Sequence, residues 1–136
     1  MKLYIAGPMT GYEQYNFPAF FDAETTLEIF GHFPVNPARN DVEIDEWDAR
    51  VSTDPPPLTG SQYMARDIPL LLDCDGIVLL AGWRDSTGAC IEAFVAAMMG
   101  LSFHNQRGEL MHITKGAFVV TILARMIDHL KMNWGE

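Results

Sequence analysis

Two patterns of apolar residues recur along the chain, continuous short runs and helical spacing, and they predict alternating strands and helices. Residues 2–6 and 75–80 are short apolar runs next to turn-forming residues, as buried parallel strands are. Residues 16–30 and 61–72 instead place their apolar side chains three and four positions apart, which is typical of amphipathic helices. We therefore predict strands at the first two segments and helices at the other two.

The remaining segments continue this alternation. The same criteria predict strands at 32–36 and 110–114, and helices at 89–101 and 116–132. A chain of 136 residues has the length of one domain. Strands and helices that alternate in one short domain indicate a parallel, doubly wound α/β sheet.

Residues 40–60 break the alternation inside this single domain, which spans residues 1–136. The segment is acidic and proline-rich, with Asp41, Glu43, Asp45, Glu46 and Asp48 followed by Pro55-Pro56-Pro57. We expect a solvated acidic loop with one helical turn around Trp47. We prefer this interpretation to a metal site, because the order of these acids does not resemble a calcium loop. A lid or binding loop is the alternative, since loops this long in small domains are often functional.

Charge and composition narrow the function classes. Nine Lys and Arg against eighteen Asp and Glu give a net charge of −9, so we expect no nucleic-acid polymer as a partner. No apolar run approaches the ~18 residues of a membrane span, and the N-terminal run is too short for a signal peptide. We therefore expect a cytoplasmic protein with no membrane partner, in which Cys74 and Cys90 are reduced. The four histidines lack ligand spacing, so no metal is expected.

Two loops combine glycine with a hydroxyl side chain at predicted carboxyl ends of strands. The first is Gly7-Pro8-Met9-Thr10-Gly11, and the second is Ser86-Thr87-Gly88-Ala89, which opens a helix. Backbone N–H groups at a helix N-terminus, together with a hydroxyl, form a phosphate cradle. Simple capping of the helix by Ser86 or Thr87 is the alternative. Two such loops at one edge of the sheet favour a bound phosphate.

The predicted helix 89–101 is apolar or glycine throughout, except for Glu92. A helix that is apolar all round must be covered on all sides, and the sheet covers one of them. We therefore expect a second copy of the chain on the other side, in a homodimer formed through this helix. A buried carboxylate is costly, so Glu92 is either hydrogen-bonded to its neighbours or a nucleophile placed beside the phosphate loop.

Asp67, from the helix at 61–72, is the candidate for a second carboxylate. Glycosyl transfer uses two carboxyl groups, one that attacks or stabilises the sugar and one that moves a proton. An ordinary surface aspartate paired with Arg66 is the alternative.

Aromatic and polar residues near these loops are further binding candidates. Asp85 can reach the sugar hydroxyls or face solvent. Trp83, Tyr12 and Phe17 can each stack on a base, or can each belong to the core.

Together these residues resemble the nucleoside 2-deoxyribosyltransferase-like superfamily. The matching motifs are Leu3-Tyr4-Ile5-Ala6-Gly7-Pro8, Arg66-Asp67-Ile68, Asp73-Cys74-Asp75-Gly76-Ile77-Val78 and the stretch from Gly82-Trp83 to Glu92. The resemblance is strongest to the branch of nucleoside 5′-monophosphate N-glycosidases and to uncharacterised, often phage-encoded relatives. It covers residues 1 to about 100.

The resemblance implies a flavodoxin-like (Rossmann-like) three-layer fold, with a short parallel sheet of four to five strands and helices on both faces. It also implies a homodimer that cleaves N-glycosidic bonds, with Glu92 as nucleophile, Asp67 as second acid and Tyr4 holding Glu92. The transferases carry an Asp six residues before the catalytic Glu, whereas the monophosphate hydrolases carry a phosphate-binding Ser there. This chain has Ser86 at that place. It departs from the hydrolases at Met9-Thr10-Gly11-Tyr12, where they carry Ser and Arg.

We therefore predict hydrolysis of the N-glycosidic bond of a (deoxy)nucleoside 5′-monophosphate, which releases the free base and the sugar 5-phosphate. No cofactor is expected, and a phage-encoded chain would act in the host cytoplasm. Three alternatives stay open: a deoxyribosyltransferase that uses the same site, a non-catalytic nucleotide-binding or sensor module, and a hydrolase of NAD or another ADP-ribosyl compound. The predicted binding residues are Gly7, Pro8, Thr10, Gly11, Trp83, Asp85, Ser86, Thr87 and Gly88.

Overall fold

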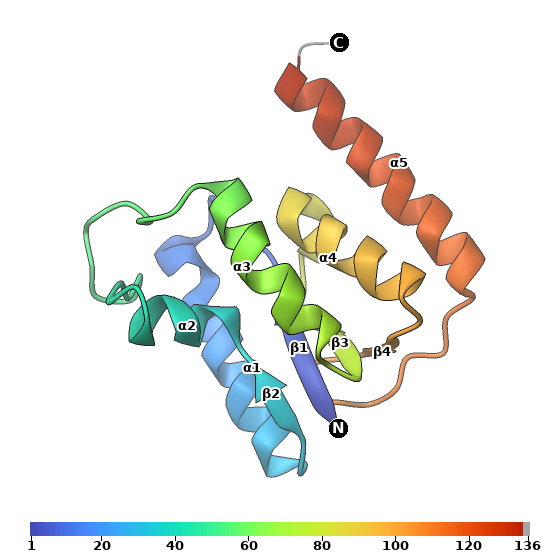
Figure 1. The fold of residues 1–136 in the computed structure, drawn as a ribbon, viewed down its shortest axis with the longest axis horizontal. Helices are drawn as coiled ribbons and strands as arrows, with labels where there is room; N and C mark the ends of the chain where they lie inside the picture. Colours follow the sequence, from blue (N-terminus) through green and yellow to red (C-terminus); the bar gives the residue numbers. More distant parts are fainter. Residues whose placement is uncertain (135–136) are drawn as a thin grey trace.

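The computed structural model describes residues 1–134, with side chains through Lys131, and four segments pair into one sheet. The strands are β1 (Lys2–Ala6), β2 (Phe33–Val35), β3 (Gly76–Leu79) and β4 (Ser102–His104). They lie in the order β2-β1-β3-β4, and each neighbouring pair is parallel (Figure 1). This order matches the first four strands of flavodoxin-like folds. The expected α/β fold with a parallel sheet of four to five strands is confirmed.

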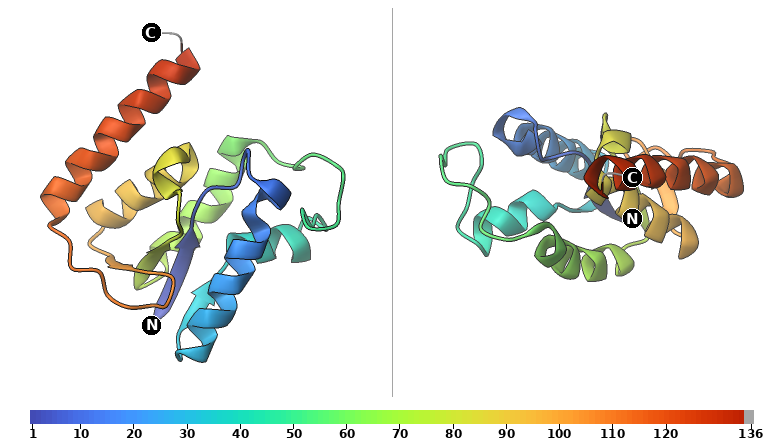
Figure 2. Two further views of the ribbon diagram at one scale, coloured as in Figure 1. Left: turned by 180° about the vertical axis from the view of Figure 1, so that it is seen from behind. Right: turned by 90° about the horizontal axis from the view of Figure 1, so that it is seen from above.

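Helices cover both faces of this sheet. They are α1 (Phe17–Ile29), α2 (Pro37–Glu43), α3 (Gly60–Leu72), α4 (Thr87–Met98) and α5 (Lys115–Trp134), with two 3₁₀ turns, η1 (Glu13–Asn16) and η2 (Trp83–Asp85). Successive side chains of β1 point to opposite faces: Leu3 and Ile5 pack with α1, whereas Tyr4 and Ala6 pack with α3 and α4. Figure 2 shows α1 on one side of the sheet and both α3 and α4 on the other.

Helix α5 packs along α4 and supplies much of the cover that a second copy was expected to give. Phe118, Ile122 and Met126 turn from α5 into the core shared with α4, and α3 contacts the other flank of α4. Because α3 and α5 of the same chain lie against the helix at 89–101, its apolar surface does not by itself require a second subunit, and the homodimer stays a prediction. Within residues 1–134, no helix is long and apolar enough to cross a membrane.

The fourth strand lies earlier in the chain than predicted. The prediction at 110–114 is wrong, because β4 is Ser102–His104, and Leu110 forms only an isolated bridge with His104. The strand is short and two of its three residues are polar. Its polar members are satisfied locally: Ser102 Oγ lies 2.7 Å from His104 Nε2, and His104 Nδ1 donates to the Gly108 carbonyl at 2.9 Å.

The acidic segment 40–60 begins in a helix where a solvated loop was expected, whereas residues 44–59 belong to no helix or strand. Its first residues belong to α2, which is capped by Asn36, whose Oδ1 accepts the Ala38 N–H at 3.0 Å. Asp41 is only 2% exposed. The expectation of a solvated loop was wrong here, because a buried Asp41 finds an ionic partner in Arg66, 25 positions further along the chain.

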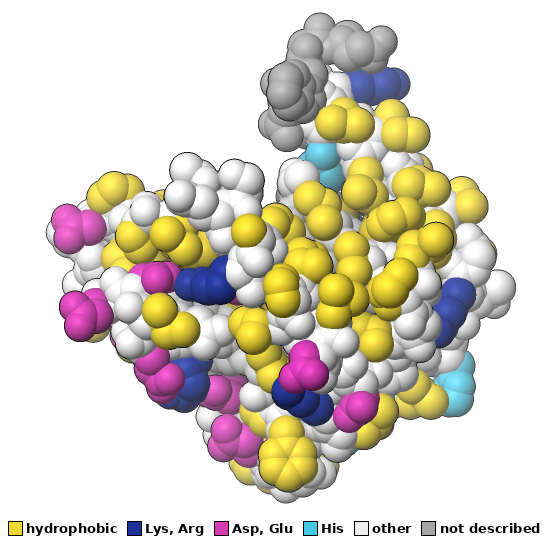
Figure 3. Space-filling model, viewed as in Figure 1, with side chains coloured by type: hydrophobic (Ala, Val, Ile, Leu, Met, Phe, Trp, Pro, Cys, Tyr) yellow, Lys and Arg dark blue, Asp and Glu magenta, His cyan; other side chains and the backbone are white. Residues whose placement is uncertain are grey.

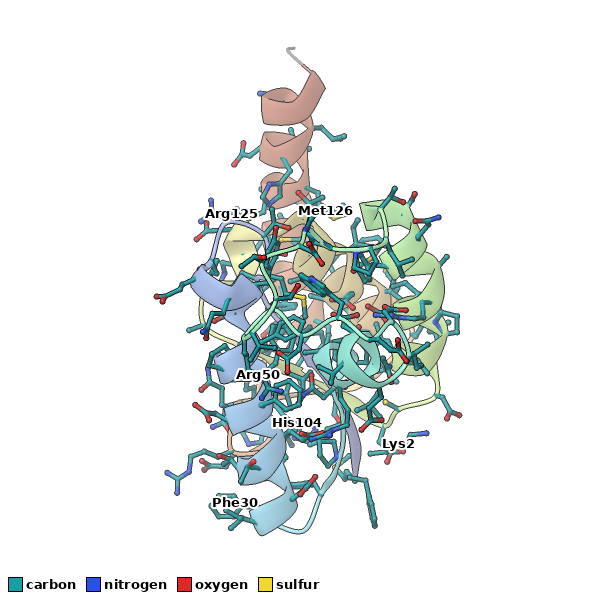
Figure 4. All side chains as sticks on the ribbon, turned by 90° about the vertical axis from the view of Figure 1, so that its left-hand side faces the viewer. Lys2, Phe30, Arg50, His104, Arg125 and Met126 are labelled. Atoms are coloured by element: carbon teal, nitrogen blue, oxygen red, sulfur yellow. The ribbon has the colours of Figure 1, made fainter. Side chains whose placement is uncertain are left out.

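Trp47 anchors the rest of this segment. Its ring is buried and lies edge-on to Tyr15 and Phe17, each with ring centroids 5.4 Å away, and its Nε1 donates to the Asp54 carbonyl at 3.1 Å. Figure 4 shows Arg50 beside α1, where its guanidinium lies 3.9 Å from the centroid of the Phe21 ring. The part of the segment from Trp47 to Asp54 is thus held against α1 and η1 by aromatic contacts.

Candidate active site

A cavity of about 800 Å³ lies beyond the carboxyl ends of β1 and β3. The chain leaves β1 toward β2 on one side and reaches β4 from β3 on the other, so this is the point at which the strand order reverses. Ligands bind at such points in open α/β sheets. Gly7 follows β1 at the cavity wall, and a Cβ there would lie 2.7 Å from the Cβ of Leu80, so glycine permits the close approach of these two chain segments.

Glu92 and Tyr4 lie together in this cavity. Glu92 comes from the second turn of α4 and is 6% exposed, and Tyr4, from the middle of β1, is fully buried. The Tyr4 hydroxyl donates a hydrogen bond to Glu92 Oε2, which is the contact that the resemblance implied. Burial raises the pKa of Glu92 to about 8; the Tyr4 hydrogen bond opposes this rise, and the negative charge of Asp67 adds to it.

Asp67 is the second carboxyl group of the cavity. It lies on the inward side of α3, it is 6% exposed, and its Oδ1 accepts a hydrogen bond from Arg66 Nε at 3.0 Å. Burial raises its pKa, and the Arg66 charge and hydrogen bond partly offset that rise. The surface aspartate considered as the alternative does not fit, because Asp67 is buried and lines the cavity.

Arg66 joins three acids into one cluster. Besides Asp67, it binds Asp41 Oδ1 through Nη2 at 2.5 Å and Asp45 Oδ2 through Nη1 at 2.6 Å. The cluster links α3 to α2 and to the segment that follows α2. Burial raises the pKa of Asp41 to about 6, against the pull of Arg66.

The N-terminus of α4 forms the wall of the cavity next to Glu92. Ser86 caps this helix, with its Oγ accepting the Ala89 N–H at 3.2 Å. Because the hydroxyl is the acceptor in that bond, its own proton remains free to be donated. The N–H groups of Thr87 and Gly88 belong to the first turn, which has no helical acceptors for them. This end of the cavity therefore offers hydrogen-bond donors and the positive end of the helix dipole.

Most of the residues predicted for the site meet around this cavity. Those that line it are Tyr4, Gly7, Pro8, Thr10, Asp67, Asp85, Ser86, Thr87, Gly88 and Glu92. Gly11 and Trp83 do not. Gly11 lies in an exposed turn with a left-handed φ of 84°. Trp83 is buried against Phe118 of α5, with ring centroids 5.6 Å apart, so the core position considered for this tryptophan is the one it takes.

Several lining residues were missed by the sequence analysis. Tyr15, Trp47, Tyr63 and Asp41 all line the cavity, although Trp47 was noted only as the centre of a helical turn. For Tyr15 and Trp47, the sequence signal was the presence of aromatic residues at 12–21 and at 47. These residues come together only in the fold, through η1 and the segment after α2. His129 also lines the cavity from α5, and its Nε2 donates to the Arg84 carbonyl at 3.2 Å.

The charged side chains that line the cavity are mainly carboxyl groups. Within the described side chains, no group of three or more His, Cys, Asp and Glu residues is arranged to hold a metal ion. Arg66 already occupies the position between the carboxylates of Asp41, Asp45 and Asp67. Two buried carboxyls, one held by a phenol and one by a guanidinium, are suited to nucleophilic attack and to proton transfer.

Fold and site thus define an α/β domain with a cavity and two buried carboxyl groups at the point where the strand order reverses. The chain belongs to the DUF4406 family, a domain of unknown function, whose model matches residues 1–104. Among solved structures, its fold is similar to that of a 2-deoxyribosyltransferase from the psychrotolerant bacterium Bacillus psychrosaccharolyticus, at a TM-score of 0.54 and 17% sequence identity. The match covers 88% of this chain and 80% of that one. No curated protein sequence matches the chain.

Proposed function

We propose that this protein is an enzyme that hydrolyses the N-glycosidic bond of a (deoxy)nucleoside 5′-monophosphate. The observation that carries the proposal is Glu92, a buried carboxyl held by Tyr4 inside a cavity that also contains Asp67. A core glutamate with only a structural role has no need of an open cavity beside it. The proposal needs no cofactor, because both groups that act on the glycosidic bond come from the chain.

In the proposed reaction, ionised Glu92 attacks the anomeric carbon of the sugar. The bond between this carbon and the base breaks, and protonated Asp67 gives its proton to the leaving base. A water molecule then attacks the anomeric carbon of the glycosyl–Glu92 ester, and Asp67 takes up a proton from that water. The products are the free base and the sugar 5-phosphate, and both carboxyls return to their starting states.

The experiment is a panel of ribo- and deoxyribonucleoside 5′-monophosphates, incubated with the protein and analysed by chromatography for free base. We expect base release by the wild type and a loss of roughly a thousandfold or more in Glu92→Gln, since nucleophile replacements cost several powers of ten. Circular dichroism of Glu92→Gln checks that the fold is kept. Near-normal base release by a folded Glu92→Gln protein would exclude Glu92 as the nucleophile.

The 5′-phosphate is proposed to bind at the N-terminus of α4. The Ser86 hydroxyl has a free proton there, and Thr87 and Gly88, whose N–H groups belong to the first turn of α4, line the same cavity. A second helix N-terminus, that of α3, also reaches the cavity, but its cap is a closed box in which Thr59 and Gln62 satisfy each other.

Ser86→Ala is expected to weaken binding of the monophosphate by about 1–3 kcal/mol, the usual value of one hydrogen bond to a charged group. The kcat/KM for the monophosphate should fall accordingly. It should leave kcat/KM for the unphosphorylated nucleoside nearly unchanged. Ser61→Ala is the matched control, because Ser61 also lines the cavity but lies at the N-terminus of α3. If Ser86→Ala affects both substrates equally, or if Ser61→Ala is the variant that discriminates, the phosphate does not bind at α4.

Deoxyribosyl transfer is the second candidate function. It is favoured by the fold shared with the 2-deoxyribosyltransferase, and it differs from hydrolysis only in the acceptor that resolves the glycosyl–Glu92 ester. Adding a second, isotope-labelled free base to the assay separates the two. Hydrolysis gives sugar 5-phosphate regardless of the added base, whereas transfer gives a labelled nucleoside or nucleotide.

A further inference from the structure

One end of the cavity takes no part in the proposed chemistry. Figure 1 shows α3 between α2 and α4. Ser86 caps α4 and Glu92 belongs to it, whereas Asp41 belongs to α2 and Trp47 follows α2. All four residues line the cavity. A nucleotide whose phosphate lies at Ser86 and whose anomeric carbon meets Glu92 therefore directs its base toward α2.

Asp41 presents one free oxygen at this end. Its side chain is 3% exposed, and Oδ1 is held by Arg66 Nη2 at 2.5 Å. Among the described residues, Oδ2 has no hydrogen-bond partner, although the residue lines the cavity. The Asp41 backbone is also fixed, because its carbonyl accepts the Trp47 N–H at 3.0 Å. The bond from Arg66 to the side chain and the bond from Trp47 to the backbone thus fix the position of the carboxylate oxygen that a ligand in the cavity meets.

Aromatic residues line the same cavity as this oxygen. Trp47, Tyr15 and Tyr12 line the cavity, and the same three residues line a neighbouring cavity of about 410 Å³. Tyr63, from α3, lines the larger cavity as well, and its buried hydroxyl has no hydrogen-bond partner among the described residues. A cavity lined by flat rings, an unpaired acceptor and an unpaired hydroxyl is suited to a planar, hydrogen-bonding ring system.

We propose that Asp41 selects the base, by accepting a hydrogen bond at Oδ2 from an exocyclic amino group. The preferred substrates are then nucleotides of amino-bearing bases, and their oxo counterparts are rejected. This inference rests on the proposed N-glycosidase function. An ionised carboxylate can only accept hydrogen bonds, so a carbonyl oxygen at the same place would leave two acceptors facing each other in a buried site. Sites of this kind discriminate strongly, because the wrong partner leaves a buried polar group unpaired.

Two substrate pairs test this inference, because each pair differs at one ring position in an amino or an oxo group. They are deoxycytidine and deoxyuridine monophosphates, and deoxyadenosine and deoxyinosine monophosphates. We expect the wild type to prefer the amino member of both pairs by about tenfold or more in kcat/KM. Asp41→Asn should bring both ratios close to one, because an amide can turn its N–H group toward an oxo substituent.

Asp45→Asn is the matched control. Asp45 binds the same guanidinium as Asp41 at 2.6 Å but does not line the cavity. This variant should lower kcat/KM for all four substrates by a similar factor and leave both ratios unchanged. A general disturbance of the Arg66 cluster therefore cannot imitate the loss of selectivity expected for Asp41→Asn.

Several outcomes overturn the inference. A preference for the oxo member in either pair contradicts it, as do ratios that Asp41→Asn leaves unchanged. If Asp41→Asn does not fold, the two wild-type ratios still decide. If no nucleotide is cleaved, the proposed function fails, and the same ratios measured as Kd by calorimetry still test the role of Asp41 in recognition.

Discussion

Glu92 and Asp67 are buried acids that face one cavity, and the negative charge of Asp67 makes Glu92 harder to ionise. Burial raises the pKa of both groups, and that of Glu92 reaches about 8. Two acids coupled in this way titrate as a pair. The proposed chemistry needs an ionised Glu92 and a protonated Asp67, which means one proton on the pair.

The pH dependence of kcat/KM follows from this shared proton. Above about pH 8 the pair loses its last proton, so we expect the activity of the wild type to fall, since Asp67 can no longer protonate the leaving base. At low pH both groups are protonated, and the activity falls because Glu92 cannot attack. The wild-type profile is therefore bell-shaped, with its alkaline limb near pH 8.

Asp67→Asn provides the contrast. The variant lacks the proton donor, so its rate should be low, but it should rise with pH as Glu92 ionises. The titration of Glu92 should also shift to lower pH, because the neighbouring negative charge is gone. An Asp67→Asn profile with the same alkaline limb as the wild type would mean that the limb belongs to another group.

At the scale of elements, Arg66 connects three parts of the chain that are far apart in sequence. Arg66 lies on α3. It binds Asp41 of α2, Asp45 after α2, and Asp67, the next residue of α3. Its side chain is 19% exposed, and those of Asp41 and Asp67 are 3% and 8% exposed. Removing one partner from a buried ionic cluster is costly, because the remaining charges stay buried without compensation.

Arg66→Met is therefore expected to lower the free energy of unfolding by about 3–5 kcal/mol. The control is Lys2→Met, which removes the exposed ion pair between Lys2 and Asp73 and should leave the free energy of unfolding nearly unchanged, because solvent screens exposed pairs. Urea denaturation followed by tryptophan fluorescence measures both. A loss for Arg66→Met as small as that for Lys2→Met would mean that the cluster does not hold α2 against α3.

Individual elements also show how much of the fold and of the site could be predicted from the sequence. Strand β1 and helix α4 were found from local pattern alone, and Glu92 stood out because it interrupts an apolar helix. Strand β4 was missed because three residues, two of them polar, carry no periodic signal. The burial of Asp41 was missed because its partner Arg66 lies on another helix, and no local pattern contains that pairing.

At the scale of the whole molecule, the described residues of α5 carry an uncovered apolar face. Its inner face packs on α4, and its outer face carries Val120, Leu123, Ile127 and Leu130, which are 66%, 42%, 52% and 57% exposed. Their spacing of three and four residues forms one stripe along the helix. Met98 and Met99, where α4 ends, are exposed as well, and hydrophobic side chains gather over the α4 and α5 side of the face in Figure 3.

We predict that this stripe pairs with a second copy of the chain, so that the homodimer forms through α5 and the end of α4 rather than through the middle of α4. Light scattering at micromolar concentration should then give twice the monomer mass of 15.2 kDa. Ile127→Glu should shift the protein toward the monomer, because it buries an unpaired charge in an apolar interface. Thr121→Glu is the control, since Thr121 is exposed on α5 outside the stripe, and it should leave the mass unchanged. A wild-type monomer contradicts the prediction, and an Ile127→Glu dimer assigns the interface to another surface.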